Sequence, residues 1–398
     1  MTREGEKIEL DITDVAFGGD GVGRKEGQAV FVPFTMIGER VEAEIVRDHG
    51  QFLRARLLRV LQSAPGRVEA RCIHFGQCAG CQYQHIPYPQ QCEIKTKQVR
   101  DVFERIGRFS SPPVRPILPS ALEYGYRSKI TLHPRDGKLC YVGWEGRPFE
   151  VKECHIAAPV IDQAIRAGGI KAVGRGDVMF RANSRGELFI HDLSSPPDDL
   201  EFVEQLGDDL EFRLPINSFF QSNIAMVPVM LETVAGRISQ SGAGYLIDAY
   251  CGAGFFALYL TRKLGLKKSW GVEIDAQAIP WARKNAERLG LSNTEFFHGA
   301  VEHVLPMLLA KHRGGLADMC VLLDPPRKGC GSKVLAAFSR FRPATVIHVS
   351  CDPATLARDL RALCDLGYQL DEIQPLDMFP QTAHIECIAT LRLDRGPT

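Results

Sequence analysis

The sequence predicts an α/β protein with three parts: a small N-terminal β-barrel, a central α+β segment, and a C-terminal parallel sheet flanked by helices. Two observations support this fold class. Apolar runs typical of strands alternate with helix-like segments from about residue 211 onward, which is typical of a parallel sheet. Residues 1–62 instead contain short strands with alternating polar and apolar residues, separated by glycine-rich turns. At ~100–200 residues per domain, 398 residues have room for several such parts.

Composition is that of an ordinary globular protein, with 45% hydrophobic and 24% charged residues. No apolar run reaches the ~18 residues of a membrane span, and the charged N-terminus lacks the apolar core of a secretion signal. We therefore expect a cytoplasmic protein with no membrane partner, and we expect it to be a monomer. Twelve cysteines in a reducing compartment are expected to serve as metal ligands or nucleophiles rather than disulfides.

Charge is unevenly distributed although the formal net charge is zero. Residues 63–190 carry an excess of lysine and arginine, whereas the segments on both sides carry an excess of acidic residues. A polyanionic partner is therefore expected to be held mostly by the middle of the chain.

The first predicted domain, residues 1–62, has the strand spacing of a five-stranded barrel of the nucleic-acid-binding, OB-like kind. Its strands are expected at 7–14, 28–32, 38–46 and 52–61, with the turn Gly18–Arg24 after the first. The second predicted domain, residues 63–210, begins at the linker Ser63–Gly66.

In the second domain, a cysteine-dense loop is followed by a helix from about Pro89 to Gly107, and we expect the helix at 90–108 to pack on the third domain. Strands and hairpin turns are expected over residues 124–192, around one helix near 158–167. Residues 211–398 form the third predicted domain.

A glycine turn lies between a strand and a helix at Asp248–Gly254. Glycines there let the backbone approach a ligand closely, and Glu273, at the end of the next strand, is the acid expected to hold a ribose diol. The third glycine of the dinucleotide fingerprint is replaced by Ala257. This favours an adenosine ligand without a pyrophosphate, such as S-adenosylmethionine, over a nicotinamide cofactor.

Two further strands end in side chains that can do chemistry. Leu322-Leu323 leads into Asp324-Pro325-Pro326-Arg327, a turn found in variant forms in many methyltransferases. The apolar run 344–349 ends at Cys351, followed by an Asp-Pro turn and a helix pattern. Because open α/β sheets keep their sites at the carboxyl ends of strands, Cys351 is a candidate nucleophile.

Three cysteines, Cys72, Cys78 and Cys81, fall within ten residues of a glycine-bearing loop. Three thiolates need a fourth ligand, and Cys154 is the best candidate, followed by Cys92 and His85. Four-cysteine sites hold zinc or an iron–sulfur cluster, and the spacing by itself slightly favours zinc.

Seven motifs occur in a fixed order along the chain. They are Gly-Gly-Asp-Gly at 18–21, Cys-x5-Cys-x2-Cys at 72–81, Asn-Ser-Phe-Phe-Gln at 217–221, Asp-x-Tyr-Cys-Gly-x-Gly at 248–254, Asp-Pro-Pro-Arg-Lys-Gly at 324–329, Ser-Cys-Asp-Pro-Ala-Thr-Leu-Ala-Arg-Asp at 350–359, and Phe-Pro-Gln-Thr-Ala-His-Ile-Glu at 379–386. Over essentially the whole chain this order resembles the RNA uridine-C5-methyltransferase family, which makes 5-methyluridine in tRNA or 23S rRNA.

The resemblance implies a C-terminal Rossmann-like methyltransferase domain, a TRAM-type RNA-binding barrel and an RNA partner, either rRNA or tRNA. It also implies roles for single residues. Cys351 matches the nucleophile and Glu386 the proton-abstracting base. The positions that match the S-adenosylmethionine site are Gln221, Tyr250, Glu273 and Asp324. The positions that match the ligands of a [4Fe-4S] cluster are Cys72, Cys78, Cys81 and Cys154.

The chemistry explains why such an enzyme needs a thiol and a carboxylate. A thiolate that adds to C6 of uracil makes C5 nucleophilic toward an electrophilic methyl group, and a base must then remove the hydrogen from C5. Arg327 or Lys328 is expected to stabilise the thiolate. Because a uridine in a folded RNA cannot reach a buried thiol, the target must be flipped out or lie in a loop.

The residues leave two other functions open: an RNA cytosine-C5-methyltransferase, which also uses a cysteine, and a non-catalytic RNA-binding protein on a methyltransferase shell. The adenine contact is also open. Ala300 stands where relatives often have asparagine or aspartate, and Glu302 or Asp318 is expected to substitute.

Overall fold

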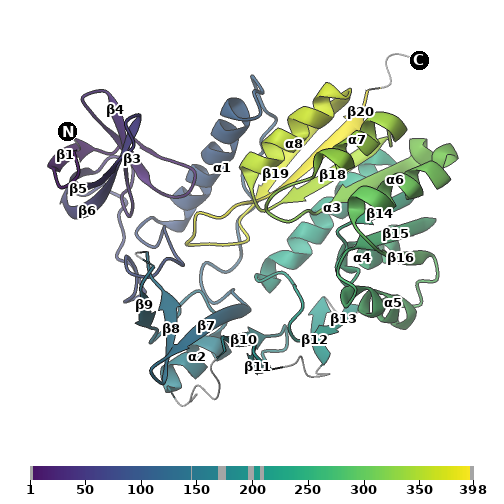
Figure 1. The fold of residues 1–398 in the computed structure, drawn as a ribbon, viewed down its shortest axis with the longest axis horizontal. Coiled ribbons are helices and arrows are strands. Elements are labelled where there is room, and N and C mark those ends of the chain that lie inside the picture. Colours follow the sequence, from purple (N-terminus) through teal and green to yellow (C-terminus); the bar gives the residue numbers. More distant parts are fainter. Residues whose placement is uncertain (1–2, 145, 169–175, 196–200, 207–209, 395–398) are drawn as a thin grey trace.

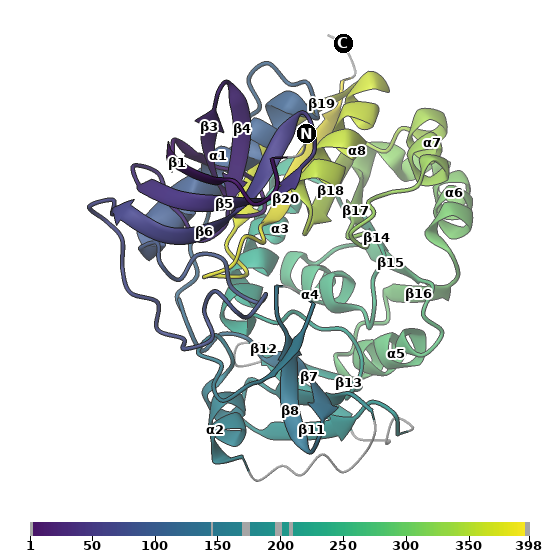
Figure 2. The same cartoon turned by 60° about the vertical axis from the view of Figure 1, so that its left-hand side comes forward.

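The computed structural model describes residues 3–144, 146–168, 176–195, 201–206 and 210–394. A small barrel lies at one end of the molecule, a central α+β part lies below it, and a large α/β part forms the other side (Figure 1). Turning the molecule shows helix α1 (Tyr88–Arg105) lying between the barrel and the α/β part (Figure 2). Among the described residues, no helix combines the length and apolar character needed to cross a membrane.

The barrel is built from one sheet in the order β1-β5-β6-β4-β3-β2. Its strands are β1 (Lys7–Asp11), β2 (Asp14–Val15), β3 (Gly21–Lys25), β4 (Gln28–Val32), β5 (Arg40–Asp48) and β6 (Phe52–Gln62). The sequence predicted a five-stranded barrel and located four of its strands. The predicted strand 7–14 is interrupted between β1 and β2, and β3 lies partly within the segment 18–24 that was predicted to be a turn. Gly23 is required on β3, because a Cβ there would lie 2.6 Å from the carbonyl oxygen of Asp11.

The central part is a five-stranded sheet in the order β11-β10-β7-β8-β9, covered by one helix. Its elements are β7 (Lys129–Arg135), β8 (Lys138–Val142), β9 (Pro148–Glu150), α2 (Pro159–Ala167), β10 (Val178–Ala182) and β11 (Leu188–Asp192). Helix α2 contributes Ile161 and Ile165 to a buried cluster that also contains Cys81 and Cys154. Two cysteines of the predicted cluster site are therefore part of the core of this region.

The α/β part contains a seven-stranded sheet in the order β16-β15-β14-β17-β18-β20-β19. The strands are β14 (Tyr245–Ala249), β15 (Lys268–Glu273), β16 (Thr294–His298), β17 (Met319–Leu323), β18 (Thr345–Ser350), β19 (Tyr368–Leu376) and β20 (Glu386–Leu393). The helices are α3 (Val227–Ser241), α4 (Phe255–Leu264), α5 (Ala278–Arg288), α6 (Val301–Lys311), α7 (Ser332–Phe341) and α8 (Pro353–Asp365), with short 3-10 turns at Ile224–Met226 and Arg313–Asp318.

This sheet confirms the predicted α/β class, but it is not purely parallel. Strands β14 to β18 run parallel, whereas β20 pairs antiparallel with both β18 and β19. The alternation of strand and helix ends at α8, and no helix separates β19 from β20. A direct strand-to-strand connection of this kind gives antiparallel pairing.

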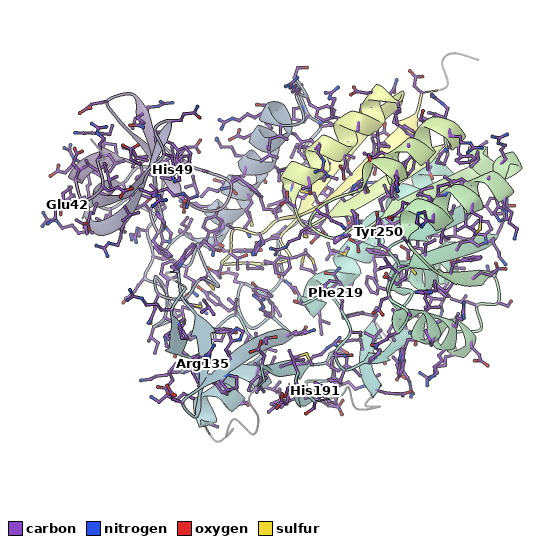
Figure 3. The ribbon with its side chains drawn as sticks, in the orientation of Figure 1. Glu42, His49, Arg135, His191, Phe219 and Tyr250 are labelled. Carbon is purple, nitrogen blue, oxygen red and sulfur yellow. The ribbon has the colours of Figure 1, made fainter. Side chains whose placement is uncertain are left out.

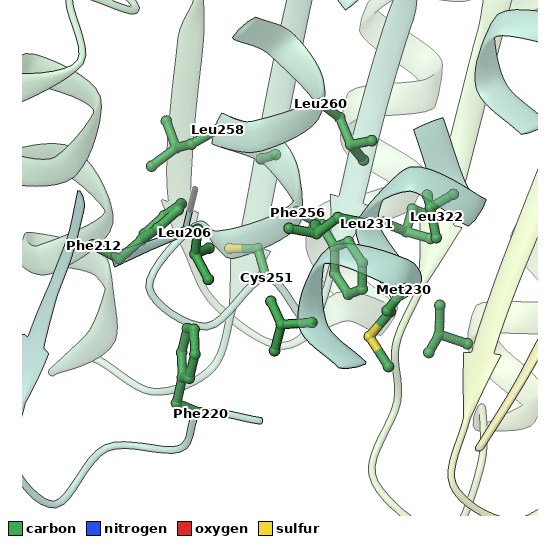
Figure 4. Close-up of a cluster of buried hydrophobic side chains, with 14 of the residues drawn as sticks. Leu206, Phe212, Phe220, Met230, Leu231, Cys251, Phe256, Leu258, Leu260 and Leu322 are labelled. Carbon is green, nitrogen blue, oxygen red and sulfur yellow. The ribbon is translucent and has the colours of Figure 1, made fainter. Parts of the chain in front are cut away.

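Helices cover both faces of the sheet. On one face, Leu246 and Leu322 pack against α3 and α4, and Figure 4 shows part of this buried cluster. On the other face, Ile247 and Val321 pack against α6, α7 and α8, together with Val99 and Phe103 of α1. Helix α1 thus belongs to the layer that covers the α/β sheet.

A separate hairpin, β12 (Glu201–Leu206) and β13 (Leu210–Pro215), lies across the predicted boundary between residues 210 and 211. Phe202 and Phe212 are buried in the same cluster as α3 and α4. The same cluster contains Met179 of β10, and the ring of Phe202 packs against Phe189 of β11, so the hairpin contacts both the α/β part and the central part.

Candidate functional site

A cavity of about 1040 Å³ opens at the carboxyl edge of the parallel strands. It is lined by residues from the turns that follow β14, β15, β16, β17 and β18, and by the segment 215–221. The predicted residues that line it are Gln221, Tyr250, Glu273, Asp324, Cys351 and Glu386. The structure therefore brings together all six residues that were expected to bind the methyl donor or to act in catalysis.

The glycine turn after β14 is tied to the next strand by Glu273. One carboxylate oxygen of Glu273 accepts a hydrogen bond from the backbone N–H of Gly252 at 2.9 Å, and the other accepts from Asp275 at 2.8 Å. Tyr250 has a positive φ of 72°, and Gly254 has one of 88° where a Cβ would collide with the ring of Phe296. The turn is thus fixed with its backbone close to the cavity, as an adenosine site requires.

Asp324 follows β17 and lines the cavity half-buried, and its charge acts on the fully buried carboxyl of Asp248. Burial raises the pKa of Asp324 to about 7, although the neighbouring His348 acts to lower it. Asp248 on β14 has its pKa raised to about 8, again chiefly by burial, and accepts a hydrogen bond from the N–H of Ala257 at 2.9 Å. A positively charged ligand beside these carboxyls would favour their ionised forms, so the site is suited to a cation.

Cys351 lies directly after β18, half-buried in the cavity wall. The next residue, Asp352, caps α8 by accepting hydrogen bonds from Ala354 and Thr355, which fixes the turn that carries the thiol. Burial and the carboxyl of Glu386 raise the pKa of Cys351 to about 11, whereas the guanidinium of Arg327 beside it acts to lower it. Arg327 is therefore the cation that favours the thiolate.

Glu386 is the first residue of β20 and is almost completely buried. Ser350 pairs with Cys387 across β18 and β20, so Cys351 and Glu386 follow next along the two strands. Burial raises the pKa of Glu386 well above its usual range, the charge of Asp324 raises it further, and Arg327 acts to lower it. A thiol, a carboxyl and a guanidinium thus share one corner of the cavity.

The loop between β19 and β20, which leads to Glu386, is held from outside the α/β part. Lys95 of α1 is fully buried and contacts Asp377 at 2.6 Å, while its ammonium also donates to the carbonyl of Phe379 at 3.1 Å. The phenol of Tyr126 donates to the carbonyl of Pro380 at 2.9 Å. Helix α1 and the central part therefore determine how this loop enters the cavity.

The predicted adenine contacts are only partly brought together. Ala300 and Glu302 line the cavity, but Asp318 does not. Asp318 precedes β17 at the opposite edge of the sheet, where it pairs with Lys267 at 2.8 Å and accepts from the N–H of Gly244. Asp318 was thus a wrong candidate. It precedes β17, whereas the Asp-Pro-Pro turn follows this strand, so the whole length of β17 separates Asp318 from the cavity.

Sequence reasoning missed two side chains at the cavity. Phe219, labelled in Figure 3, is 78% exposed and borders both this cavity and the cysteine-lined cavity of the central part. Its neighbour Phe220 is buried in the cluster shown in Figure 4. His384 lines the cavity, and burial together with the charge of Arg327 lowers its pKa to about 4. Both lie in irregular segments, where no periodicity distinguishes an exposed ring from a buried one.

A second cavity, of about 450 Å³, lies in the central part and is lined by Cys72, Cys78, Cys81 and Cys154. The other candidates for the fourth ligand, His85 and Cys92, do not line it. Burial raises the thiol pKa to about 11 at Cys72 and about 12 at Cys81, and the charges of the other cysteines raise both further.

Several features of this cavity fit a cationic metal group. Four cysteines line the same cavity, and the N–H of Gly80 points to the sulfur of Cys78 at 3.3 Å. Burial raises the thiol pKa of both Cys78 and Cys154, and the charge of Arg127 acts to lower it. Because thiols crowded together repel one another as thiolates, the set is suited to a shared metal centre.

Comparisons with known proteins agree with this architecture. A family model described as tRNA (Uracil-5-)-methyltransferase matches residues 199–393, and a TRAM domain model matches residues 2–58. An RNA methyltransferase of Halalkalibacterium halodurans is 33% identical, with 97% of each chain covered. An RNA methyltransferase of Synechocystis sp. is 31% identical over 100% of this chain and 98% of that protein.

Among solved structures, the tRNA (uracil-54, C5)-methyltransferase of Pyrococcus abyssi in complex with S-adenosyl-L-homocysteine is similar with a TM-score of 0.74. The likeness covers 96% of this chain and 100% of that chain at 24% identity. It confirms the fold class, with a barrel at the N-terminus and a Rossmann-like C-terminal part.

Proposed function

Because this chain belongs to the RNA uracil-C5-methyltransferase family, we propose that it transfers a methyl group from S-adenosylmethionine to C5 of a uridine in a structured RNA. The observation that carries this proposal is the shared corner of the larger cavity, where Cys351, Glu386 and Arg327 lie together. A thiol, a base and a cation are what uracil-C5 methylation requires.

In the proposed reaction, the thiolate of Cys351 forms a bond to C6 of the uracil ring, and the electrons of the C5–C6 double bond move into an enolate. Carbon C5 then attacks the methyl group of S-adenosylmethionine, and the electrons of the S–CH₃ bond stay on sulfur, so that S-adenosylhomocysteine leaves. Glu386 removes the remaining hydrogen from C5 as a proton, the C5–C6 double bond re-forms, and the C6–sulfur bond breaks to release the thiolate. Atoms and electrons balance without any oxidant or reductant.

The electrostatics of the site bear on these roles. Burial raises the pKa of the Cys351 thiol to about 11, and the guanidinium of Arg327 opposes that rise, which favours the attacking thiolate. The raised pKa of Glu386 makes its carboxylate a stronger base than an exposed glutamate.

S-adenosylmethionine supplies an electrophilic methyl group on a sulfonium cation. We assign its binding to Gln221, Tyr250, Glu273 and Asp324, which line the same cavity. Glu273 is suited to the ribose hydroxyls, since it already orders the glycine turn. The half-buried carboxyl of Asp324, with its pKa near neutrality, is suited to a cationic ligand.

The RNA is proposed to approach across the central part, with the target base turned out of its stack into the cavity. Phe219 stands exposed at the cavity edge, where an aromatic ring can stack on a base. The four cysteines of the central part are proposed to hold a [4Fe-4S] cluster. Because the reaction needs no electron, this cluster would stabilise the region that faces the RNA.

The experiment is a product analysis. Purified protein is incubated with S-adenosylmethionine labelled in its methyl group and with unmodified tRNA or 23S rRNA, and the RNA is digested to nucleosides. Labelled 5-methyluridine is the expected product, and mapping it identifies the RNA and the position. Labelled 5-methylcytidine would overturn the uridine assignment, and no label with any RNA would overturn the catalytic one.

A further inference from the structure

Three buried side chains that take no part in the proposed reaction converge directly beneath the cavity. Cys330 comes from the loop after β17, His348 from β18 and Asp359 from α8. Their ligand atoms all lie within 4.8 Å of one another, and His348 and Asp359 have no exposed surface. A nitrogen, a sulfur and a carboxylate oxygen are thus gathered in a place that water does not reach.

The orientation of His348 directs an electron pair at the other two groups. Its Nδ1 lies 3.0 Å from the carbonyl oxygen of Val349, which accepts a hydrogen bond from it. Nε2 then faces Cys330 Sγ at 3.6 Å and Asp359 Oδ2 at 3.5 Å. A proton or a metal ion is needed among these three atoms, because burying several electron-pair donors face to face is unfavourable.

The Nε2–Sγ separation of 3.6 Å suits either a hydrogen bond to sulfur or a shared metal ion, so the Nε2–Oδ2 separation is the informative one. A charge-assisted N–H···O hydrogen bond spans about 2.7–2.9 Å, and the Nε2–Oδ2 separation is longer. Zinc holds nitrogen at ~2.0–2.1 Å and sulfur at ~2.3 Å, so the edges of its tetrahedron measure about 3.3–3.6 Å. Both separations from Nε2 fit such edges.

We propose that Cys330, His348 and Asp359 bind a structural Zn²⁺ ion. They supply three of the four ligands of a tetrahedral zinc site, namely one sulfur, one nitrogen and one oxygen.

The surroundings of the three groups are those of oriented metal ligands. Asp359 accepts from Arg358 through Oδ1, at 2.8 and 3.0 Å, and from the N–H of Cys330 through Oδ2 at 2.6 Å. Such outer partners fix the ligand atoms before a metal arrives. Gly329 lets the loop come this close, since a Cβ there would lie 2.6 Å from Asp359 Oδ2.

The ion would join segments that carry the catalytic residues. The loop 324–331 holds Asp324 and Arg327, and His348 precedes Cys351 by three positions on the same strand and turn. Arg358 adds a hydrogen bond to the carbonyl of Lys328 at 2.9 Å. Zinc in this position would therefore hold the loop that carries Arg327 next to the turn that carries the Cys351 thiol.

The test is made on the full-length wild-type protein, purified anaerobically with its iron and supplied with one equivalent of Zn²⁺. One zinc per chain is expected, and zinc K-edge X-ray absorption should show one sulfur at about 2.3 Å and nitrogen or oxygen ligands at about 2.0–2.1 Å. Four sulfur neighbours would place the zinc among Cys72, Cys78, Cys81 and Cys154 and overturn the proposal. Folded, iron-loaded protein that binds no zinc would overturn it as well.

Variants provide an independent check. Cys330→Ser and Asp359→Asn should lose zinc and keep their iron, whereas Cys72→Ser should lose iron and keep zinc. Cys364→Ser, at a half-buried thiol of α8 that lies outside the cluster, is the matched control and should keep both metals. Zinc retained at full stoichiometry in folded Cys330→Ser would contradict the assignment. These readouts do not depend on methylation, so the site and the proposed function can fail separately.

Discussion

Both cavities of this protein contain cysteine thiols, but the charged groups that surround these thiols differ between the two cavities. In both, burial raises the thiol pKa, to about 11 at Cys351 and to about 11 at Cys72. Beside Cys351 lie one cation and one carboxyl, Arg327 and Glu386. Beside Cys72 lie other cysteines, whose charges raise its pKa further. The comparison teaches that the neighbours of a thiol, more than its burial, decide between a nucleophile and a metal ligand.

The strongest test of this difference is to remove Cys351, the thiol that has a cation beside it. Cys351→Ala should reduce methylation by about 10⁴-fold or more, because no other group can bond to C6. Incorporation of labelled methyl into RNA measures the loss. Cys364→Ala, which also removes a half-buried thiol, should leave the rate unchanged. Undiminished methylation by Cys351→Ala would exclude a covalent mechanism.

Glu386→Gln keeps the shape of the side chain and removes the base. Turnover is expected to fall by about 10²–10⁴-fold, because the hydrogen on C5 is no longer removed. Since expulsion of Cys351 requires that step, the methylated RNA should remain attached to the protein, which denaturing gels of labelled RNA detect. Glu295→Gln, at a surface ion pair with Lys268, is the control. Normal turnover without an adduct would contradict the role of Glu386.

Arg327→Met should show the effect of the cation on the thiol. Without the guanidinium the pKa of Cys351 rises above about 11, so a smaller fraction is thiolate at any lower pH. The rate of alkylation of Cys351 by iodoacetamide at pH 8 should fall by roughly tenfold per pKa unit, and its rise with pH should shift to higher pH. Arg340→Met on α7 should match the wild type. An unshifted profile would mean that Arg327 does not act on the thiol.

The smallest effect on the catalytic rate is expected in the other cavity. Cys81→Ser should lose iron and lower the melting temperature by several degrees, because metal binding contributes to folding. At saturating RNA the rate per folded molecule should change by less than about threefold, since no electron is needed. Cys140→Ser, at a buried thiol on β8 that does not line the cavity, should keep its iron. A large loss of rate with the fold intact would give this cavity a part in the chemistry.

The sequence allowed much of the fold and of the candidate site to be predicted, because the relevant signals are local. The strands that end at Tyr250, Asp324 and Cys351 are continuous apolar runs followed by turn residues. The antiparallel pairing of β20 was not predicted. The pairing depends on contacts with other strands, and the residues of β20 by themselves do not indicate its direction in the sheet.

Other features of the site depend on long-range packing. Lys95 lies within the predicted helix, but its burial against Asp377 was not predicted, because no residue near it in the sequence indicates that partner. The proximity of Cys330, His348 and Asp359 was not predicted for the same reason.

The contact between Lys95 and Asp377 also has a consequence for how the protein is made. The two residues are 282 positions apart, so the ribosome delivers the lysine long before its partner exists. Contacts of such high sequence separation form late and slowly. Helix α1 must therefore lie beside an incomplete sheet until β20 has been made, and the loop that leads to Glu386 takes its final shape only then. A nascent chain released before Glu386 is made would lack the proposed base and could not methylate RNA.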